Sequence, residues 1–164
     1  VMARDPQTVM VLPECSNAPT RGWGNSYQSN WSNVRSQAQT TEDALCAAGV
    51  SSSNVSQHVV SAHSNGGNAL HQALTNTPGG AGVRADRLEL YDCFYGNWDN
   101  TIRDFGATPN GAAVREVAYY HGTNSGSRAG REREFGAAFP GRFTYVESNN
   151  HNHTVRDNFD ILGQ

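Results

Sequence analysis

The chain has 164 residues, 37% of them hydrophobic, and a formal net charge of −3, so it is long enough to form one domain with a sizeable core. Its mean hydropathy is −0.62 and no apolar run approaches the roughly 18 residues that a membrane span needs, so we expect no membrane span. We also expect no nucleic-acid partner, because Arg128, Arg131 and Arg133, the densest basic cluster, are interleaved with Glu132 and Glu134.

The cysteines indicate neither a metal site nor a single redox compartment. Cys15, Cys46 and Cys93 do not have the spacing of metal ligands. They fit either one disulfide with a free thiol or three free thiols. We therefore expect no metal and no cofactor.

Apolar runs alternate with helical patterns through the first half of the chain. Residues 8–12 predict a buried strand, and the polar residues 15–39 predict a long loop. Start and stop signals predict a helix over 41–49. A strand over 57–62 and a helix over 66–74 follow.

The second half repeats this alternation. The predicted elements are a strand over 87–91, a helix over 98–105, a strand over 114–120, a helix over 126–138, a strand over 142–146 and a helix over 155–162. Alternating strands and helices imply right-handed crossovers and a mainly parallel sheet of about five strands with helices on both faces. No repeat or composition shift divides the chain, so we expect residues 1–164 to form a single three-layer α/β/α domain.

Residues 62–67, with the sequence AHSNGG, lie between a predicted strand and a predicted helix. Ser64 has a small residue two positions before it, Ala62, and two positions after it, Gly66, as a tight strand–turn–helix connection requires. Such a turn projects the hydroxyl from the sheet edge beside the N–H groups of a helix N-terminus, which can stabilise an oxyanion. A helix N-cap is the alternative role of Ser64. The strand before it, the helix after it and the paired glycines favour a nucleophile.

At this stretch the sequence resembles the α/β-hydrolase family, whose lipases and esterases commonly carry Gly-His-Ser-x-Gly-Gly. Ala62 replaces the first glycine, as it does in some members. In the order of its elements nearly the whole chain is similar to the smallest, cutinase-like members. The resemblance implies a minimal α/β-hydrolase-like fold, with the Asn65 amide as one oxyanion donor. It implies a second donor from the loop after the first strand, where Cys15 is the middle one of three candidates.

A candidate acid follows the strand predicted over 87–91. Ligands bind at the carboxyl ends of parallel strands, and Asp92 stands at such an end. Members of the family that the chain resembles usually carry the acid one strand later. In this chain residues 121–125, which follow that strand, include no carboxylate. Some lipases of the family carry the acid at the earlier position, which Asp92 fits. Asp99 is the fallback, and a turn-forming role is the alternative for Asp92.

Two histidines compete for the role of general base. His153 stands just before the helix predicted over 155–162, where the family usually places its histidine, and His151 is the alternative base. Two histidines at this spacing could also bind a metal, but no third ligand has a matching spacing. The remaining histidines are expected to be structural or exposed: His58, His63, His71 and His121.

The chain order Ser64, Asp92, His153 is the order that α/β-hydrolases use. It predicts a serine hydrolase that cleaves an ester or amide of a polar or short-chain acid through an acyl-enzyme. The expected partner is a small-molecule or polymeric ester or amide substrate. Two alternatives stand beside this prediction. One is a peptidase or amidase that acts on a peptide or cell-wall substrate with the same triad, and the other is a catalytically inactive binding domain on the same fold.

Overall fold

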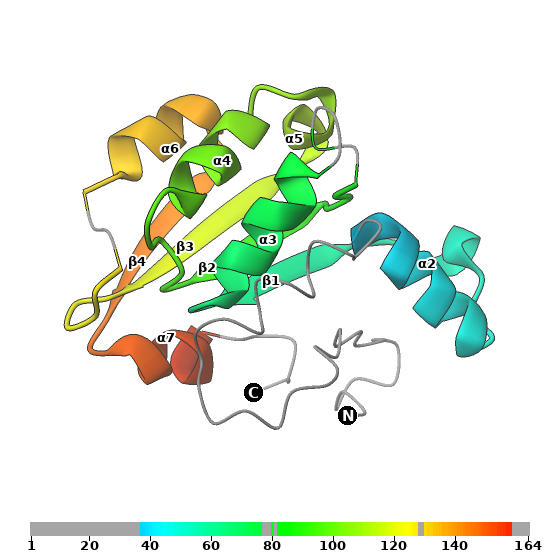
Figure 1. Ribbon diagram of the computed structural model, residues 1–164, viewed down its shortest axis with the longest axis horizontal. Coiled ribbons are helices and arrows are strands. Elements are labelled where there is room, and N and C mark those ends of the chain that lie inside the picture. Colours follow the sequence, from blue (N-terminus) through cyan, green and yellow to red (C-terminus); the bar gives the residue numbers. More distant parts are fainter. Residues whose placement is uncertain (1–36, 77–79, 81, 128–129, 159–164) are drawn as a thin grey trace.

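The computed structural model describes residues 37–76, 80, 82–127 and 130–158 (Figure 1). Within these residues four strands, all parallel, form one sheet in the order β1-β2-β3-β4. The strands are β1 (Val59–His63), β2 (Arg87–Tyr91), β3 (Glu116–Gly122) and β4 (Phe143–Ser148). The α/β class and the parallel sheet are therefore confirmed. The strand predicted over 8–12 and the loop predicted over 15–39 fall outside the described residues, except for the last three loop positions, which are helical.

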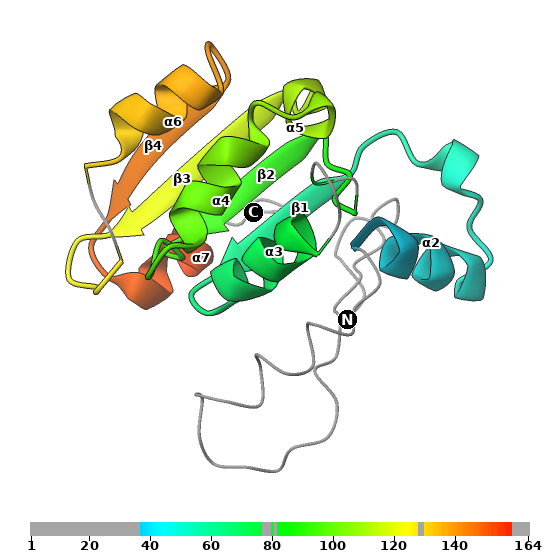
Figure 2. The same ribbon diagram turned by 45° about the horizontal axis from the view of Figure 1, so that its top comes forward.

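The helices that connect these strands lie on one face of the sheet. They are α3 (Gly66–Thr75) between β1 and β2, α4 (Trp98–Phe105) and α5 (Pro109–Ala113) between β2 and β3, and α6 (Glu132–Ala138) between β3 and β4. Each strand is added on the same side of the one before it, so right-handed crossovers bring their helices to the same face. Figure 2 shows α3, α4 and α6 in front of the sheet.

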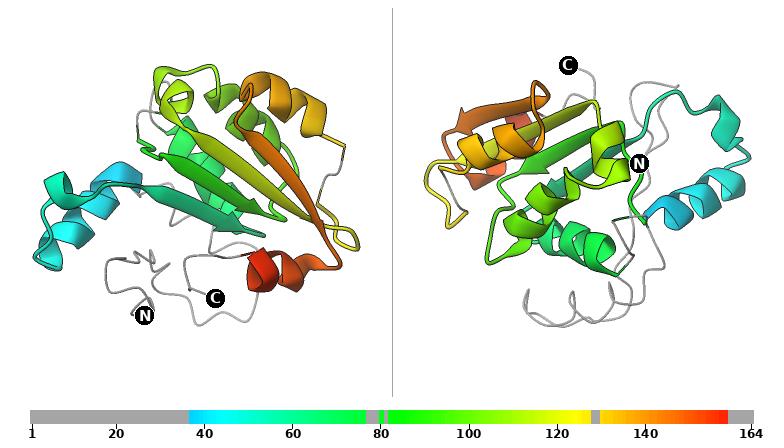
Figure 3. Two further views of the ribbon diagram at one scale, coloured as in Figure 1. Left: turned by 180° about the vertical axis from the view of Figure 1, so that it is seen from behind. Right: turned by 90° about the horizontal axis from the view of Figure 1, so that it is seen from above.

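The last described helix, α7 (His151–Asn158), lies on the opposite face, beside the carboxyl ends of the strands (Figure 3). Its Val155 packs against a small buried cluster that contains Tyr91 and Tyr120. The rings of these two tyrosines stack with their centroids 4.7 Å apart. The position of α7 brings its first residues to the ends of the strands.

The helix α2 (Gln37–Ala47) and a 3-10 helix (Ser52–Asn54) lie beyond the amino end of β1. At 11 residues, α2 is the longest helix in the described part of the chain. In that part, every helix is too short or too polar to cross a membrane.

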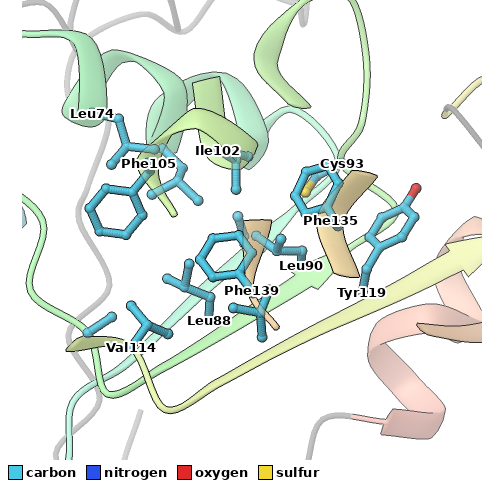
Figure 4. Close-up of a cluster of buried hydrophobic side chains, with 14 of the residues drawn as sticks. Leu74, Leu88, Leu90, Cys93, Ile102, Phe105, Val114, Tyr119, Phe135 and Phe139 are labelled. Atoms are coloured by element: carbon cyan, nitrogen blue, oxygen red, sulfur yellow. The ribbon is translucent and has the colours of Figure 1, made fainter. Parts of the chain in front are cut away.

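The main hydrophobic core fills the space between the sheet and α3, α4 and α6 (Figure 4). Side chains on a strand alternate between the two faces, so Leu88 and Leu90 of β2 enter this core. The ring of Phe94 stacks on Tyr119, with centroids 3.8 Å apart, and on Phe135, with centroids 4.6 Å apart. This core holds the strand ends that carry the site in a fixed arrangement.

Several helices differ from the sequence predictions. The helix α2 spans Gln37–Ala47 instead of the predicted residues 41–49. The differences at α6 and α5 have local causes. The helix predicted over 126–138 begins only at Glu132, because Gly130 takes a left-handed φ of +74° that interrupts a helix. The helix α5 was not predicted. Thr108 caps it by accepting a hydrogen bond from the Gly111 N–H at 3.0 Å, and Pro109 occupies its first turn.

Candidate active site

Ser64 and Asp92 occupy equivalent backbone positions at the ends of neighbouring strands. Ser64 directly follows β1, and its N–H donates to the carbonyl of Tyr91 at 3.0 Å. Asp92 directly follows β2, and its N–H donates to the carbonyl of Tyr120 at 2.7 Å. Both residues then take a left-handed φ, +53° and +45°, which is uncommon without glycine and frequent at functional sites. Each turn therefore leaves the sheet abruptly at its carboxyl edge.

The turn after Ser64 leads into α3, whose cap position belongs to Asn65. The Asn65 side chain makes no capping hydrogen bond. Ser64 is therefore not the N-cap of α3, which was the alternative role for this residue.

In this turn the second glycine, Gly67, is the position where a Cβ atom has no room. A Cβ atom on Gly67 would lie 2.4 Å from the carbonyl oxygen of Cys93 and 2.9 Å from its Cβ. A Cβ atom on Gly66 would lie 3.8 Å from that of Ala62, which is an ordinary contact. Gly67 is therefore the residue that lets α3 approach the loop after β2.

The carboxylate of Asp92 is 0% exposed and receives three hydrogen bonds. One oxygen accepts from the Ser125 hydroxyl at 2.8 Å and from the Gly122 N–H at 3.1 Å, and the other accepts from Nδ1 of His151 at 2.6 Å. Burial acts to raise the pKa of Asp92, but the hydrogen bonds from His151, Ser125 and Gly122 outweigh it and leave this pKa below its ordinary value. Asp92 is therefore a fixed negative charge at neutral pH.

Two of the donors to Asp92 come from the end of β3 and from the loop that follows it, a segment with no carboxylate of its own. Ser125 is held in turn by the Ser127 N–H, which donates to its hydroxyl at 3.1 Å. A Cβ atom on Gly122 would lie 2.9 Å from Oδ2 of Asp92 and 2.8 Å from the backbone nitrogen of His151, so only glycine fits there. Sequence reasoning missed both donors. The glycine and serines of this loop were a visible signal, but nothing local links them to Asp92.

The structure brings His151 to Asp92 and takes His153 elsewhere. The helix α7 begins at His151, four residues before its predicted start, since the Asn150 side chain caps it by accepting from the His153 N–H at 3.0 Å. Nδ1 of His153 lies 3.8 Å from the carboxylate of Asp157 on the same helix. The alternative base, His151, therefore pairs with the candidate acid, and the preferred candidate, His153, does not.

The bond to Asp92 sets the chemistry of the His151 ring. With Nδ1–H donating to the carboxylate, Nε2 of the neutral ring carries the lone pair and is the basic nitrogen. The hydroxyl of Tyr95 lies 3.5 Å from the same Nδ1. Burial, followed by the charge of Asp92, raises the pKa of Tyr95, so this phenol stays neutral.

His151 also lies beside the Ser64 turn. The ring of His63, the residue before Ser64, packs against the ring of His151 in a tilted arrangement, with centroids 4.5 Å apart. Within residues 37–76, 80, 82–127 and 130–158, no hydrogen bond joins the Ser64 hydroxyl to His151 or to His153. His63 was expected to be structural or exposed, and its contact with His151 is a feature that the sequence did not reveal.

The remaining candidates divide into one fallback acid and two oxyanion donors. Asp99, the fallback acid, is 0% exposed and forms an ion pair with Arg131 at 2.9 Å, so its charge already has a partner. Asn65 stands at the N-terminus of α3, directly after Ser64. Cys15, the other proposed donor, falls outside the described residues.

Among the described residues, no group of three or more histidine, cysteine, aspartate or glutamate side chains is arranged to hold a metal ion. His151 and His153 are directed to different carboxylates, those of Asp92 and Asp157.

Comparisons of the chain with protein-family models, with curated proteins and with solved structures give no match.

Proposed function

We propose that the chain is a serine hydrolase in which Ser64 is the nucleophile, His151 the general base and Asp92 the acid that orients the base. The observation that carries this proposal is the 2.6 Å hydrogen bond between Nδ1 of His151 and the buried carboxylate of Asp92. A serine hydroxyl is a weak nucleophile until a base takes its proton, and an imidazole held by a carboxylate is such a base. The left-handed turn of Ser64 lies at the same edge of the sheet.

In the proposed reaction, Oγ of Ser64 attacks the carbonyl carbon of an ester or amide, and its proton passes to Nε2 of His151. His151 then gives this proton to the leaving group as the bond to that group breaks, which leaves an acyl-serine. Water attacks the acyl carbon and gives a proton to Nε2, and the acid product leaves as Ser64 regains its proton. Asp92 stays ionised throughout and stabilises the imidazolium that forms twice in the cycle.

The oxyanion of each tetrahedral intermediate needs N–H donors in fixed positions. We assign one donor to the backbone amide of Asn65, because the N-terminus of α3 carries a partial positive charge. The amide of Cys15 is proposed as the second donor. We also propose that the fold has about five strands in a three-layer, minimal α/β-hydrolase-like arrangement.

The polar composition of the chain supports a substrate with a polar or short-chain acyl group. A small-molecule ester and a polymeric ester or amide both fit this description. Rates on p-nitrophenyl acetate and on a p-nitroanilide peptide separate the proposed esterase from a peptidase or amidase that uses the same three residues.

Fluorophosphonate labelling followed by intact-mass measurement tests the proposal, because the probe attaches covalently to an activated serine. The wild-type protein is expected to gain one adduct at Ser64, and the Ser64→Ala variant none. Ser61→Ala is the matched control, since Ser61 lies in β1 close to Ser64 but its hydroxyl donates to Glu89 at 2.9 Å. Folded wild-type protein that gains no adduct would overturn the proposal.

A binding domain without activity is the second candidate. It is favoured by one observation, that within the described residues the Ser64 hydroxyl makes no hydrogen bond to His151. Catalytic hydrogen bonds often tighten only when substrate is bound. The labelling experiment decides between the two candidates, because the inactive domain predicts no adduct on any serine.

A further inference from the structure

His63 touches the proposed base through two separate contacts. Its ring lies on the ring of His151, with 4.5 Å between centroids and 32° between planes. Its Nε2 lies 3.4 Å from the carbonyl oxygen of His151. His63 is the last residue of β1 and His151 the first of α7, so these contacts join the strand that carries Ser64 to the helix that carries the base.

We propose that His63 is a positioning residue that, in its uncharged form, holds the ring of His151 between Asp92 and Ser64. This proposal rests on the proposed hydrolase function. The hydrogen bond to Asp92 fixes one edge of the His151 ring but leaves the ring free to rock about that edge. A second ring packed against it restricts this motion, and an Nε2–H donated to the carbonyl fixes the backbone of the same residue.

The surroundings of His63 keep it uncharged. Burial, and after it repulsion by His151, lower the pKa of His63, against smaller raising effects of the hydrogen bond to the His151 carbonyl and of Asp92. Among the described residues, two further titratable groups lie near the pair: Tyr95, with its hydroxyl 3.5 Å from Nδ1 of His151, and His121, with its Nδ1 3.4 Å from the Asp92 carboxylate. A second positive ring 4.5 Å away would oppose the imidazolium that His151 must form during turnover.

Two substitutions separate the contribution of the ring contact from that of the hydrogen bond. His63→Ala removes both, and we expect kcat to fall on the order of 10- to 100-fold with little change in KM, because His63 positions the base and touches no substrate. His63→Phe keeps a ring against His151, and we expect a smaller loss, within about 10-fold. An equal loss of kcat in the two variants would contradict a role for the ring.

His71→Phe is the matched control. His71 is also a partly buried histidine whose pKa is lowered by burial, but it lies in α3 and its Nδ1 contacts the Thr101 hydroxyl at 2.8 Å. We expect its kcat to stay within about twofold of the wild type, since it does not contact the base. A loss as large as that of His63→Ala would show that any altered histidine in this domain slows the reaction, and would overturn the specific role of His63.

The pH profile gives a readout that a purely structural role would not change. The proposal requires an uncharged His63, so protonation of His63 as the pH falls should steepen the acid limb of log kcat/KM from a one-proton to a two-proton slope. In the His63→Phe variant this limb should keep the one-proton slope. A one-proton slope in both proteins would overturn the requirement for an uncharged His63.

A titration followed by NMR tests the coupling of the two rings without any substrate. The pKa of His63 should rise in the His151→Phe variant, which removes the repelling charge, and should not change in His153→Phe. An unchanged pKa of His63 in His151→Phe would overturn the coupling, even in an active hydrolase. A wild-type protein without hydrolase activity would instead overturn the proposed function, and the titration would still show whether the rings are coupled.

Discussion

The turns after β1 and β2 have similar backbone geometry, but the side chain is partly exposed in the first turn and buried in the second. Ser64 and Asp92 both extend the strand ladder by one hydrogen bond and both take a left-handed φ. Asp92 is then 0% exposed and receives three hydrogen bonds. Ser64 is partly exposed, and its hydroxyl has no bond to either candidate base among the described residues. The same backbone geometry thus positions a buried, charged carboxylate at Asp92 and a partly exposed hydroxyl at Ser64.

The neighbours of each strand explain the difference. In the described sheet β2 lies between β1 and β3, so the end of β3 at Gly122 and the loop after it at Ser125 close over the end of β2. The chain after Ser64 instead turns directly into α3. Within the described residues, a neighbouring strand end therefore donates hydrogen bonds to the Asp92 side chain, and none donates to the Ser64 hydroxyl.

Removing the Ser64 hydroxyl is expected to have the largest effect on kcat. Ser64→Ala should lower kcat on p-nitrophenyl acetate by roughly 10⁵- to 10⁶-fold, because it removes the oxygen that forms the proposed acyl intermediate. Steady-state rates corrected for uncatalysed hydrolysis measure this. A variant that keeps more than about a tenth of the wild-type rate would show that the nucleophile lies elsewhere.

Neutralising the Asp92 carboxylate is expected to have the second-largest effect on kcat. Asp92→Asn should lower kcat by about 10⁴-fold, since an amide holds the His151 ring in the wrong tautomer and leaves the imidazolium without a counter-charge. Asp157→Asn, which alters the carboxylate beside His153, is the matched control and should keep its rate. A greater loss in Asp157→Asn than in Asp92→Asn would transfer the acid role to Asp157.

The two glycines after Ser64 test whether the turn depends on close approach. Gly67→Ala should lower the free energy of unfolding by about 1–3 kcal/mol, because the added Cβ meets the backbone of Cys93. Gly66→Ala adds a Cβ in ordinary contact and should change stability by less than about 1 kcal/mol. Denaturant midpoints at constant m-value measure both. Equal losses in the two variants would mean that the turn has no special demand at Gly67.

The smallest expected effect is a shift in the pH of acid unfolding when one hydrogen-bond donor to Asp92 is removed. Its folded pKa lies below the unfolded value, so the ionised carboxylate contributes stability above about pH 4 that is lost as the pH falls through the folded pKa. Ser125→Ala removes one donor and raises that folded pKa. Acid unfolding should therefore begin at a pH higher by up to about one unit.

Circular dichroism during acid titration measures this shift. Thr123→Ala is the control from the same loop, because the Thr123 hydroxyl donates at 3.3 Å to the carbonyl of Asn149 and not to Asp92. The same acid midpoint in Ser125→Ala as in Thr123→Ala would show that the Ser125 hydroxyl contributes nothing to the ionised carboxylate.

Much of the fold could be read from local patterns. The alternation around Leu88 and Leu90 predicted β2 with its observed bounds, and α4 was also predicted over its observed residues. The limits of α6 and α7 were less accurate. They depend on the left-handed φ of Gly130 and on the cap formed by Asn150, and both are single-residue effects that weigh little in a periodic pattern.

The candidate site was predictable only where it is local. Ser64 and Asp92 stand next to predicted strands, so their positions at the sheet edge followed from the sequence. The choice between His151 and His153 did not, since it depends on where α7 begins. Ser125 lies 33 residues from Asp92, and only tertiary structure brings them together.

The pairing of Asp92 with His151 is the central claim, and labelling rates of two histidine variants test it most directly. His151→Gln should slow fluorophosphonate attachment at Ser64 by at least about 10³-fold, since the hydroxyl loses its base. His153→Gln should label at a rate within a few-fold of the wild type, because its ring faces Asp157. Fast labelling of His151→Gln together with slow labelling of His153→Gln would contradict this claim.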